Sequence, residues 1–367
     1  MLRQLLLTLA GVTRSAARPM AAAVAIMLAI LLPSKFAGPA RAAIVIATVP
    51  VGNLGNPVDT STSQHPSMKR YGSVARAFRI GATEVTNAQY VEFLNGVDPT
   101  GTNTLELYNN RMTSSNGLGG ITFNGGGADG AKYDIKVGHD NTPVVYVSWY
   151  DSIRFANWLH NGQGSGDTEN GAYTILGATP TPSNGSIIVR NPGARWFLPS
   201  EDEWYKAAYH KNDGVTGNYW SWPTSTNTRP TAAPPPGSDA PDPSNTANIS
   251  FAAMRLPSFE STGKFLTDAG AYTFSTSPYG TFDQGGNVAE WNETPFLESR
   301  IIRGGTWDNS ASELGSDRRI VARGATLESL LLGFRVASIP EPSTLALLGL
   351  SLLLLGRRFH PAGECSN

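Results

Sequence analysis

The sequence predicts a loop-rich α+β domain, and three observations support this. Of the 367 residues, 39 are glycine and 25 are proline, so much of the chain must form turns and loops. Three stretches carry a helix-capping signal followed by an apolar face, and short β-branched runs lie between them. With 40% hydrophobic and 16% charged residues, the chain can bury one sizeable core and still carry targeting segments.

The first 42 residues have the composition of an export signal. They contain five basic residues and no acidic one, with an apolar run over 20–32 and a small-residue site that predicts cleavage after Ala42. A retained membrane anchor is the alternative, although the apolar run is short for a span. Cleavage would leave 23 of the 28 Lys and Arg against 29 Asp and Glu, a net charge near −6. This charge gives no indication of a nucleic-acid partner.

Elements of the first half follow the export signal. The β-branched run 44–51 predicts the first strand. Thr86 and Gln89 form a capping box that starts a helix, and Gly96 is expected to end it. Residues 101–140 are rich in glycine and have no helical period, so they predict a surface insertion.

The middle of the chain repeats this alternation. Residues 143–147 predict a buried strand, and Ser148 with Asp151 caps a second helix that runs to Leu159. Residues 172–176 and 187–190 predict a hairpin.

A third helix and a long loop come next. Ser200 with Glu203 caps the third helix. Residues 224–243, rich in Pro, Ser and Thr, predict an extended loop inside one domain.

Residues 285–307 are expected to form a packed, turn-rich centre. Asn287 and Glu290 lie three apart in a glycine-flanked turn, so two side-chain oxygens and a backbone carbonyl could converge on a hard cation such as calcium. An ordinary turn shows the same pattern. Gly304 and Gly305 allow a close backbone approach.

Six motifs, in order and at similar spacing, resemble the formylglycine-generating, sulfatase-modifying factor family. The resemblance spans residues 81–337 and implies an α+β, C-type-lectin-like, loop-rich domain, which we place at 43–338. The motifs are EVTNAQYVEFLN (84–95), PVVYVSWYDSIRFANWL (143–159), FLPSEDEWYKAAY (197–209), GGNVAEW (285–291), RGGTW (303–307) and GFRVA (333–337).

The resemblance also implies a chemistry whose reactive groups are missing here. Enzymes of that family oxidise a cysteine of a client sulfatase with oxygen and a copper(I) ion held by two cysteines. Those cysteines would fall near Asn309 and near Glu313 or Leu314, and neither place holds one. The single cysteine, Cys365, lies beyond the C-terminal sorting segment described below. Copper is therefore not expected, because copper(I) requires soft thiolate ligands.

Polar side chains stand at that place instead. They could bind a polar ligand or form a solvated loop. The arginines Arg318 and Arg323, and Arg319 between them, could either contact a ligand or pair with buried acids and so fix the loop. The candidate ligand-binding residues are Thr306, Asp308, Asn309, Glu313, Arg318 and Arg323.

Calcium is implied by the resemblance at one site and in part at a second. Asn287, Val288 and Glu290 match one structural calcium site of the family. Asn248 and Ile249 match the first half of another, whose later Asp is Thr262 here. Loss of a carboxylate weakens a calcium site, so occupancy of the second site stays open.

Residues 339–358 resemble a PEP-CTERM sorting signal, followed by a tail at 359–367. Two prolines flank Glu341, an apolar run covers 345–355, and two arginines follow. The resemblance implies export through the inner membrane of a Gram-negative cell, processing by an exosortase, transient membrane association and a place on the outer surface or in the extracellular matrix. An ordinary hydrophobic C-terminal helix is the alternative, but it leaves the prolines and the basic end unexplained.

We therefore expect an exported, surface-sorted and non-catalytic ligand- or matrix-binding module, with exopolysaccharide as the expected partner class. One alternative is a formylglycine-generating-type oxidoreductase, or another metal-dependent oxidase, that uses a non-cysteine site around Asp308, Asn309 and Glu313. A structural envelope protein is a further alternative.

Overall fold

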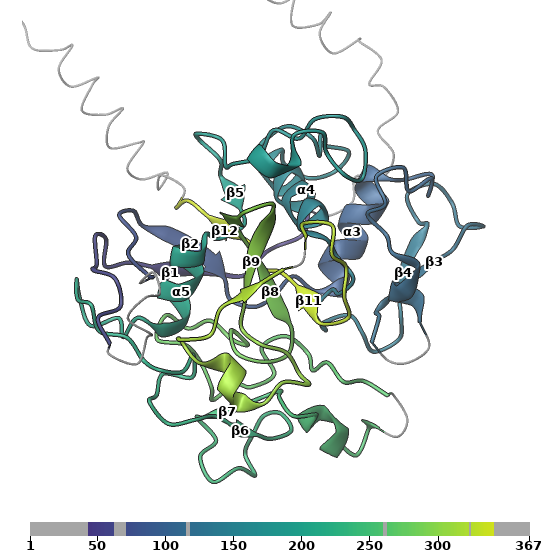
Figure 1. Cartoon of the computed structure of the whole chain (residues 1–367). Helices are drawn as coiled ribbons and strands as arrows, with labels where there is room; N and C mark the ends of the chain where they lie inside the picture. The colour runs from purple at the N-terminus through teal and green to yellow at the C-terminus, as the bar shows by residue number, and fades with distance from the viewer. Residues whose placement is uncertain (1–42, 62–70, 115–117, 260–262, 323, 341–367) are drawn as a thin grey trace, which may run out of the picture. The chain divides into compact units, whose positions relative to one another are not determined.

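Three α-helices and several small sheets, joined by long loops, make up the described part of the chain (Figure 1). The computed structural model describes residues 43–61, 71–114, 118–259, 263–322 and 324–340. The predicted export signal, most of the sorting segment and the tail lie outside these ranges. The mixture of helices and mainly antiparallel strands confirms the predicted α+β class.

One four-stranded sheet joins the two ends of the domain. Its order is β1 (Thr48–Val51), β2 (Phe78–Gly81), β12 (Ala337–Ser338) and β5 (Trp196–Phe197), and every pairing is antiparallel. The last strand of the described chain is therefore hydrogen-bonded between an early strand and a middle one.

A second four-stranded sheet takes its two central strands from the stretch predicted to be turn-rich. Its order is β10 (Ile320–Val321), β9 (Ser299–Arg303), β8 (Ala289–Phe296) and β11 (Leu332–Gly333). β8 and β9 form an antiparallel hairpin, and β11 pairs with β8 in parallel. Residues 285–292 and 300–307 are buried, as a packed centre predicts, but the turn at 295–298 is exposed and the stretch consists of strands as well as turns.

The remaining strands form two pairs. β3 (Ile121–Phe123) and β4 (Tyr133–Ile135) are antiparallel, and β6 (Thr231–Ala232) and β7 (Thr246–Ala247) are parallel. The 3₁₀ helices of the described chain are η1 (Asn110–Thr113), η2 (Gly185–Ile187), η3 (Ala252–Arg255) and η4 (Ala311–Leu314).

All three predicted capping boxes are confirmed. They start α3 (Asn87–Val97), α4 (Trp149–His160) and α5 (Glu201–Tyr209). Gly96 does not end the first of these helices, because it lies inside α3 and the backbone N–H of Asp98 still donates to Leu94. None of the helices in the described ranges is long and apolar enough to cross a membrane.

The other strand predictions need correction. The first strand begins at Thr48 instead of residue 44. Residues 143–147 are buried but form only one isolated bridge, from Pro143 to Thr86. The hairpin predicted at 172–176 and 187–190 is reduced to the bridge between Tyr173 and Arg190.

The side chain of Asn184 explains the loss of that hairpin. It accepts a hydrogen bond from the backbone N–H of Leu176 and donates to the carbonyl of Thr174. These backbone groups are therefore bonded to an amide side chain instead of a strand.

The core lies around α3 and α4. Rings of Tyr90, Phe93, Phe155, Trp158 and Phe334 pack with centroids 5.2 to 6.5 Å apart. The stretch 101–140, predicted as a surface insertion, adds buried side chains to this core, among them Leu107, Ile121 and Tyr133. These anchor the β3–β4 pair beside α3.

Candidate functional site

A fully buried ion pair holds the centre of the second sheet. Glu290 on β8 receives two hydrogen bonds from Arg335, Nε to Oε2 and Nη2 to Oε1, each 2.6 Å long. The indole N–H of Trp204 on α5 also donates to Oε2 at 2.8 Å. Both charged side chains have an exposed fraction of 0%. Both carboxylate oxygens of Glu290 therefore already have strong partners.

Asn287 points to a different set of partners. Its backbone has a φ of 56°, in the left-handed region that Asn tolerates, after Gly286 at 91°. Its Oδ1 accepts from the N–H of Thr267 and from Nδ2 of Asn248, both at 3.1 Å. Its Nδ2 donates to Glu84 at 3.2 Å. The two side chains predicted to share a cation thus face separate networks.

Two buried carboxylates that the sequence analysis missed complete this region. Glu84 and Asp283 interact electrostatically with Glu290 and with Arg335. Burial raises the pKa of Glu84 well above its usual value, and Asp283 adds to this rise. Burial also raises the pKa of Asp283 to about 6. Their signal in the sequence was their position, Glu84 at the start of the first motif and Asp283 just before the GGNVAEW motif.

Two oxygens of this region lack a hydrogen-bond donor among the described residues. They are Oε2 of Glu84 and Oδ1 of Asn248, and each of these residues is only 1% exposed. Nδ2 of Asn248 donates to the carbonyl of Phe265 at 2.9 Å. Buried acceptors are normally satisfied, so these two oxygens fit a site that takes a further donor, a water molecule or a hard cation.

The fit to calcium is therefore uneven. Three carboxyl groups gather around one guanidinium, and the donor-free Oδ1 of Asn248 and the carbonyl of Phe265 are oxygen atoms of the kind that calcium takes. Glu290 fits less well, because calcium there would compete with Arg335. Across the described ranges, no group of three or more His, Cys, Asp or Glu side chains is placed to hold a metal. Calcium stays a prediction.

The candidate ligand loop is closed by its own hydrogen bonds. Thr306 donates through its hydroxyl to Asp308 and through its backbone N–H to Oδ1 of Asn309 at 3.1 Å. Nδ2 of Asn309 donates to Asp308 at 3.2 Å. Thr306 is buried, whereas Asp308, Asn309 and Glu313 are half-buried. The structure thus brings these four residues into one loop that ends in η4.

The arginines of this region have different partners. Arg319 donates to both oxygens of buried Glu201, with Nε 2.9 Å from Oε1 and Nη2 2.9 Å from Oε2. Arg303 on β9 donates to the same Oε1 at 2.7 Å through Nη2. Arg318 is exposed and donates to the carbonyl of Ser312. Arg323 lies outside the described residues. Arg319 therefore ties the chain to a buried acid, and Arg318 stays at the loop surface.

Aromatic side chains border the loop on one side. The backbone N–H groups of Ser250 and Phe251 donate to the carbonyls of Asn309 and Trp307, both at 2.9 Å. The rings of Phe251 and Phe265 lie 5.3 and 4.6 Å from that of Trp307. Phe251 is 44% exposed, so an aromatic surface continues the polar loop.

Trp222 borders the loop on the η4 side. It is half-buried and packs on the small cluster of Ala247, Ile249 and Leu314. Leu314 is the last residue of η4, so Trp222 stands beside the loop that carries Glu313.

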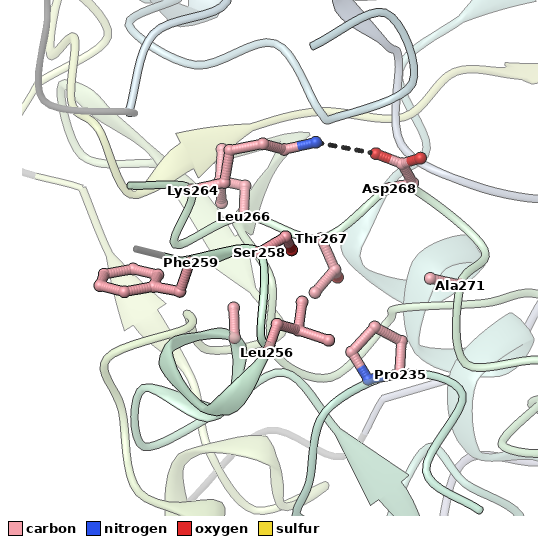
Figure 2. A pocket seen from close by; sticks show the side chains of 10 residues that line it. Pro235, Leu256, Ser258, Phe259, Lys264, Leu266, Thr267, Asp268 and Ala271 are labelled. Atoms are coloured by element: carbon pink, nitrogen blue, oxygen red, sulfur yellow. Dashed lines mark hydrogen bonds and ion pairs between the residues drawn. The ribbon is translucent and has the colours of Figure 1, made fainter. Parts of the chain in front are cut away.

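A cavity of about 220 Å³ lies behind this aromatic surface (Figure 2). Its wall includes Leu256, Phe259 and Leu266, and the ring of Phe259 lies 5.1 Å from that of Phe265. Lys264 and Asp268 form an ion pair of 3.3 Å on the same wall. The cavity is thus mainly apolar with one charged pair.

No curated protein matches the sequence. Among solved structures, Treponema denticola variable protein 1 is 18% identical with a TM-score of 0.49 and alignment coverage of 80% of this chain and 95% of that one. CarF is 19% identical with a TM-score of 0.47 and coverage of 81% and 99%. PvdO from Pseudomonas aeruginosa is 17% identical with a TM-score of 0.42 and coverage of 80% and 92%.

Family profiles account for nearly all of the chain after the predicted export signal. The PEP-CTERM protein-sorting motif matches residues 338–358, which confirms the predicted sorting signal. The Sulfatase-modifying factor enzyme 1-like domain matches residues 41–339, and the predicted C-type-lectin-like, loop-rich fold class of that family is confirmed with it. The chain therefore belongs to the sulfatase-modifying factor family.

Proposed function

We propose that this protein is an exported, surface-sorted and non-catalytic member of its family that binds a ligand or matrix component. The PEP-CTERM motif indicates export and surface sorting, and it implies processing by an exosortase. One observation carries the non-catalytic part. The loop where the family holds copper contains Asp308, Asn309 and Glu313, and the single cysteine of the sequence is Cys365.

The exposed surface of the loop suits a polar, hydroxyl-rich ligand. Asp308 and Asn309 offer hydrogen-bonding groups at a half-buried position, where displaced water strengthens each bond. Phe251 and Trp222 stand on two sides with exposed or half-exposed rings that can pack on the apolar face of a sugar. We propose exopolysaccharide as the partner class, and the outer surface or extracellular matrix as the location.

Binding of the secreted, processed protein to exopolysaccharide tests this proposal. Asp308→Ala and Trp222→Ala are each expected to weaken binding about tenfold, as the loss of roughly 1.4 kcal/mol of contact would give. Asp239→Ala is the matched control, because Asp239 is an exposed acid that accepts from the hydroxyl of the neighbouring Ser238. Equal loss in all three variants, or no binding by the wild type, would contradict the proposal and favour a structural envelope protein.

The oxidase alternative is decided by a different measurement. Metal analysis of the purified protein is combined with oxygen uptake in the presence of a cysteine peptide. Stoichiometric copper or iron, together with conversion of the thiol to an aldehyde, would overturn the non-catalytic proposal. Calcium alone would agree with it.

Calcium is the structural cation we propose for the region around Asn248. The buried carboxyl groups and the donor-free Oδ1 of Asn248 support it. We propose that the Asn248 and Ile249 oxygens contribute more than Glu290 does, since both oxygens of Glu290 bind Arg335.

A further inference from the structure

Four bulky apolar side chains are exposed on the part of the domain that borders β5. A single exposed apolar side chain is ordinary, but several gathered on one face indicate an interaction surface. The four, with exposed fractions of 50, 73, 66 and 87%, are Leu176, Ile187, Val189 and Leu297, and we call them the apolar face.

Hydrogen bonds bring together the segments that carry three of these side chains. The bridge from Tyr173 to Arg190 and the hydrogen bond from the N–H of Asn191 to the carbonyl of Ala172 join the segments at one end. At the other end, the side chain of Asn184, just before η2, bonds to the backbone of Thr174 and Leu176. Ile188 between the two exposed residues is only 2% exposed. Ile187, the last residue of η2, and Val189 thus both face away from the core, on either side of buried Ile188.

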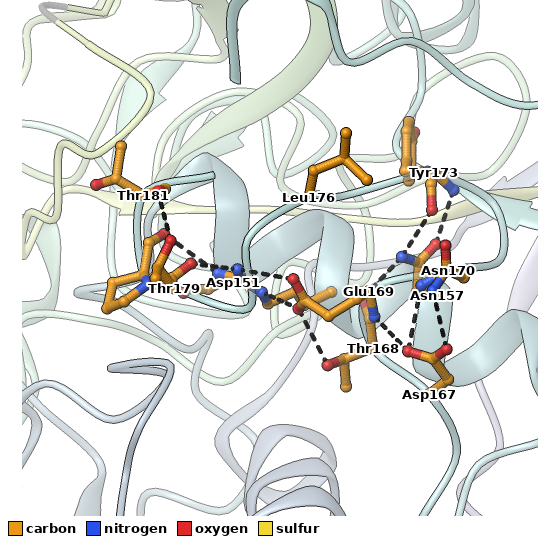
Figure 3. A network of polar contacts seen from close by, with 12 residues as sticks. Asp151, Asn157, Asp167, Thr168, Glu169, Asn170, Tyr173, Leu176, Thr179 and Thr181 are labelled. Atoms are coloured by element: carbon orange, nitrogen blue, oxygen red, sulfur yellow. Dashed lines mark hydrogen bonds and ion pairs between the residues drawn. The ribbon is translucent and has the colours of Figure 1, made fainter. Parts of the chain in front are cut away.

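Polar contacts hold the segment that carries Leu176 on α4 (Figure 3). Asn157 accepts from the N–H of Tyr173 at 2.8 Å and donates to the carbonyl of Thr168 at 2.7 Å. Fully buried Arg154 pairs with Glu169 at 2.7 Å. The segment that carries Leu176 is therefore part of the folded domain and not a loose loop.

Arg300 connects the 185–189 segment to the β8–β9 hairpin, whose turn carries Leu297, the fourth side chain of the apolar face. Its Nη2 donates to the carbonyls of Gly185 and Ile188 at 3.2 and 3.1 Å. Arg300 stands near the start of β9, and Leu297 occupies the turn between β8 and β9. The strand that follows this turn is thus tied to the 185–189 segment through Arg300.

The chain leaves the domain next to the same face. The guanidinium of Arg190 lies 3.5 Å from the ring centroid of Phe197 on β5 and donates to the carbonyl of Leu198. β5 pairs with β12, and the N–H of Ile339 donates to the carbonyl of Arg195 at 3.2 Å. The described chain therefore ends beside Arg195, one short loop away from Arg190.

We propose that the apolar face lies on the membrane surface while the C-terminal apolar run is inserted in the bilayer. The run begins at Leu345, five Cα steps after Pro340, so the domain can stand at most about 18 Å from it. The eleven residues of the run are fewer than the roughly 20 that span a bilayer, which draws its flanks toward the headgroups.

The chemistry of the face suits an anionic lipid surface. Its aliphatic side chains fit the boundary between headgroups and acyl chains, and exposed Arg195 at the exit point can bind lipid phosphates. The inference rests on the PEP-CTERM match and is independent of ligand binding at the Asp308 loop.

A fluorophore sensitive to its surroundings tests the placement in the full chain. Cys365→Ser removes the native thiol, and Ile187→Cys or Val137→Cys supplies a single labelling position. Val137 is the control, because it is fully exposed at 101% and belongs to the 101–140 stretch. Each labelled chain is reconstituted in vesicles of phosphatidylethanolamine and phosphatidylglycerol and titrated with iodide.

The expected result is a blue shift and at least a threefold protection from iodide at position 187, with neither at 137. Equal quenching at both positions would overturn the proposal. Equal protection at both would also overturn it, since it would show unspecific adsorption. Protection at 187 in chains kept in buffer without vesicles or detergent would assign the face to a second copy, if it rises with protein concentration, or to the chain's own apolar run, if it does not.

A second variant protects the test against misfolding. Val189→Glu with Leu297→Glu, added to the labelled Ile187→Cys chain, introduces two exposed charges at positions that are already exposed in the fold. We expect an unchanged midpoint of thermal unfolding and loss of the iodide protection. Unchanged protection would contradict membrane contact by this face.

Discussion

Arg335 and Glu290 form a two-bond ion pair with no exposed surface, and Glu84 and Asp283 interact with the same guanidinium. The pair joins the last motif of the family, GFRVA, to the GGNVAEW motif 45 residues earlier. The side chain of Arg335 also donates to the carbonyls of Gly81 and Phe282. One residue thus ties together three separate parts of the domain, at 81, at 282–290 and at 333–337.

Removal of that guanidinium should be among the most damaging single changes. Arg335→Gln leaves buried carboxylates without their cation, and we expect a loss of about 3–5 kcal/mol in the free energy of unfolding. Urea denaturation measures it. Asp129→Asn is the control, because Asp129 is 74% exposed in its ion pair with Lys132 and should change stability by less than about 1 kcal/mol. Similar losses in both variants would contradict this reading of the pair.

Calcium is expected to raise the midpoint of thermal unfolding of the wild type. A ligand that binds only the folded state at 100 times its dissociation constant stabilises by about 2.7 kcal/mol. Asn248→Ala should abolish the calcium-dependent rise. Glu290→Gln should lower the midpoint with and without calcium and keep most of the rise, because its main partner is Arg335. A wild type that does not respond to calcium would remove the cation from this account.

Gly286 is expected to tolerate no side chain. Its φ is 91°, and a Cβ there would lie 2.5 Å from the carbonyl oxygen of Asn248. Gly193, with φ 79° and nothing within 4 Å of the place where a Cβ would lie, shares the backbone strain without the collision. Gly286→Ala should therefore cost clearly more than the roughly 1–2 kcal/mol expected for Gly193→Ala. Equal destabilisation of the two variants in thermal unfolding would contradict this prediction, because it would show that the backbone at Asn248 moves to make room for the added Cβ.

Glu328 should make stability depend on pH. It lines a groove with Asn109 and Arg111, and burial, then the charge of Asp151, raises its pKa to about 7. A raised carboxyl pKa means that the folded state binds the proton more tightly than the unfolded state. The contribution of Glu328 to the free energy of unfolding is therefore complete below about pH 4.5 and is lost as pH rises through about 7.

Glu328→Gln keeps a neutral acceptor for Asn109 at every pH, so we expect its urea midpoint to fall less between pH 5 and pH 8 than that of the wild type. Asp151, whose pKa burial raises to about 6, should leave part of the slope in place. An identical slope in wild type and variant would refute the assignment to Glu328.

The sequence predicted the helices well because their signals are local. Thr86, Ser148 and Ser200 each satisfy an N–H three residues later in the same turn, so the pattern contains both partners. Strands were predicted less well because their partners are distant. β12 has only two residues, and its place between β2 and β5 is fixed by pairing across more than 250 and 130 residues.

The candidate site shows the same division. The motifs located the loop with Thr306, Asp308 and Asn309, whose mutual bonds span three residues. Periodicity could not reveal that Glu84 would stand beside Asn287, 203 residues away, or that Glu201 would receive Arg319. Periodicity also could not show that both carboxylate oxygens of Glu290 bind Arg335, because that depends on the position of Arg335 in space.

The placement of β12 between β2 and β5 sets a limit on how the precursor can be trimmed. The final backbone bond of the described chain into that sheet comes from Ile339, and the sorting motif begins at residue 338. A cut on the carboxyl side of Ile339 would spare every rung of this ladder, whereas a cut two residues earlier would remove Ser338 and with it half of β12. Cleavage of the precursor is therefore compatible with the folded sheet only if the protease cuts on the carboxyl side of Ile339.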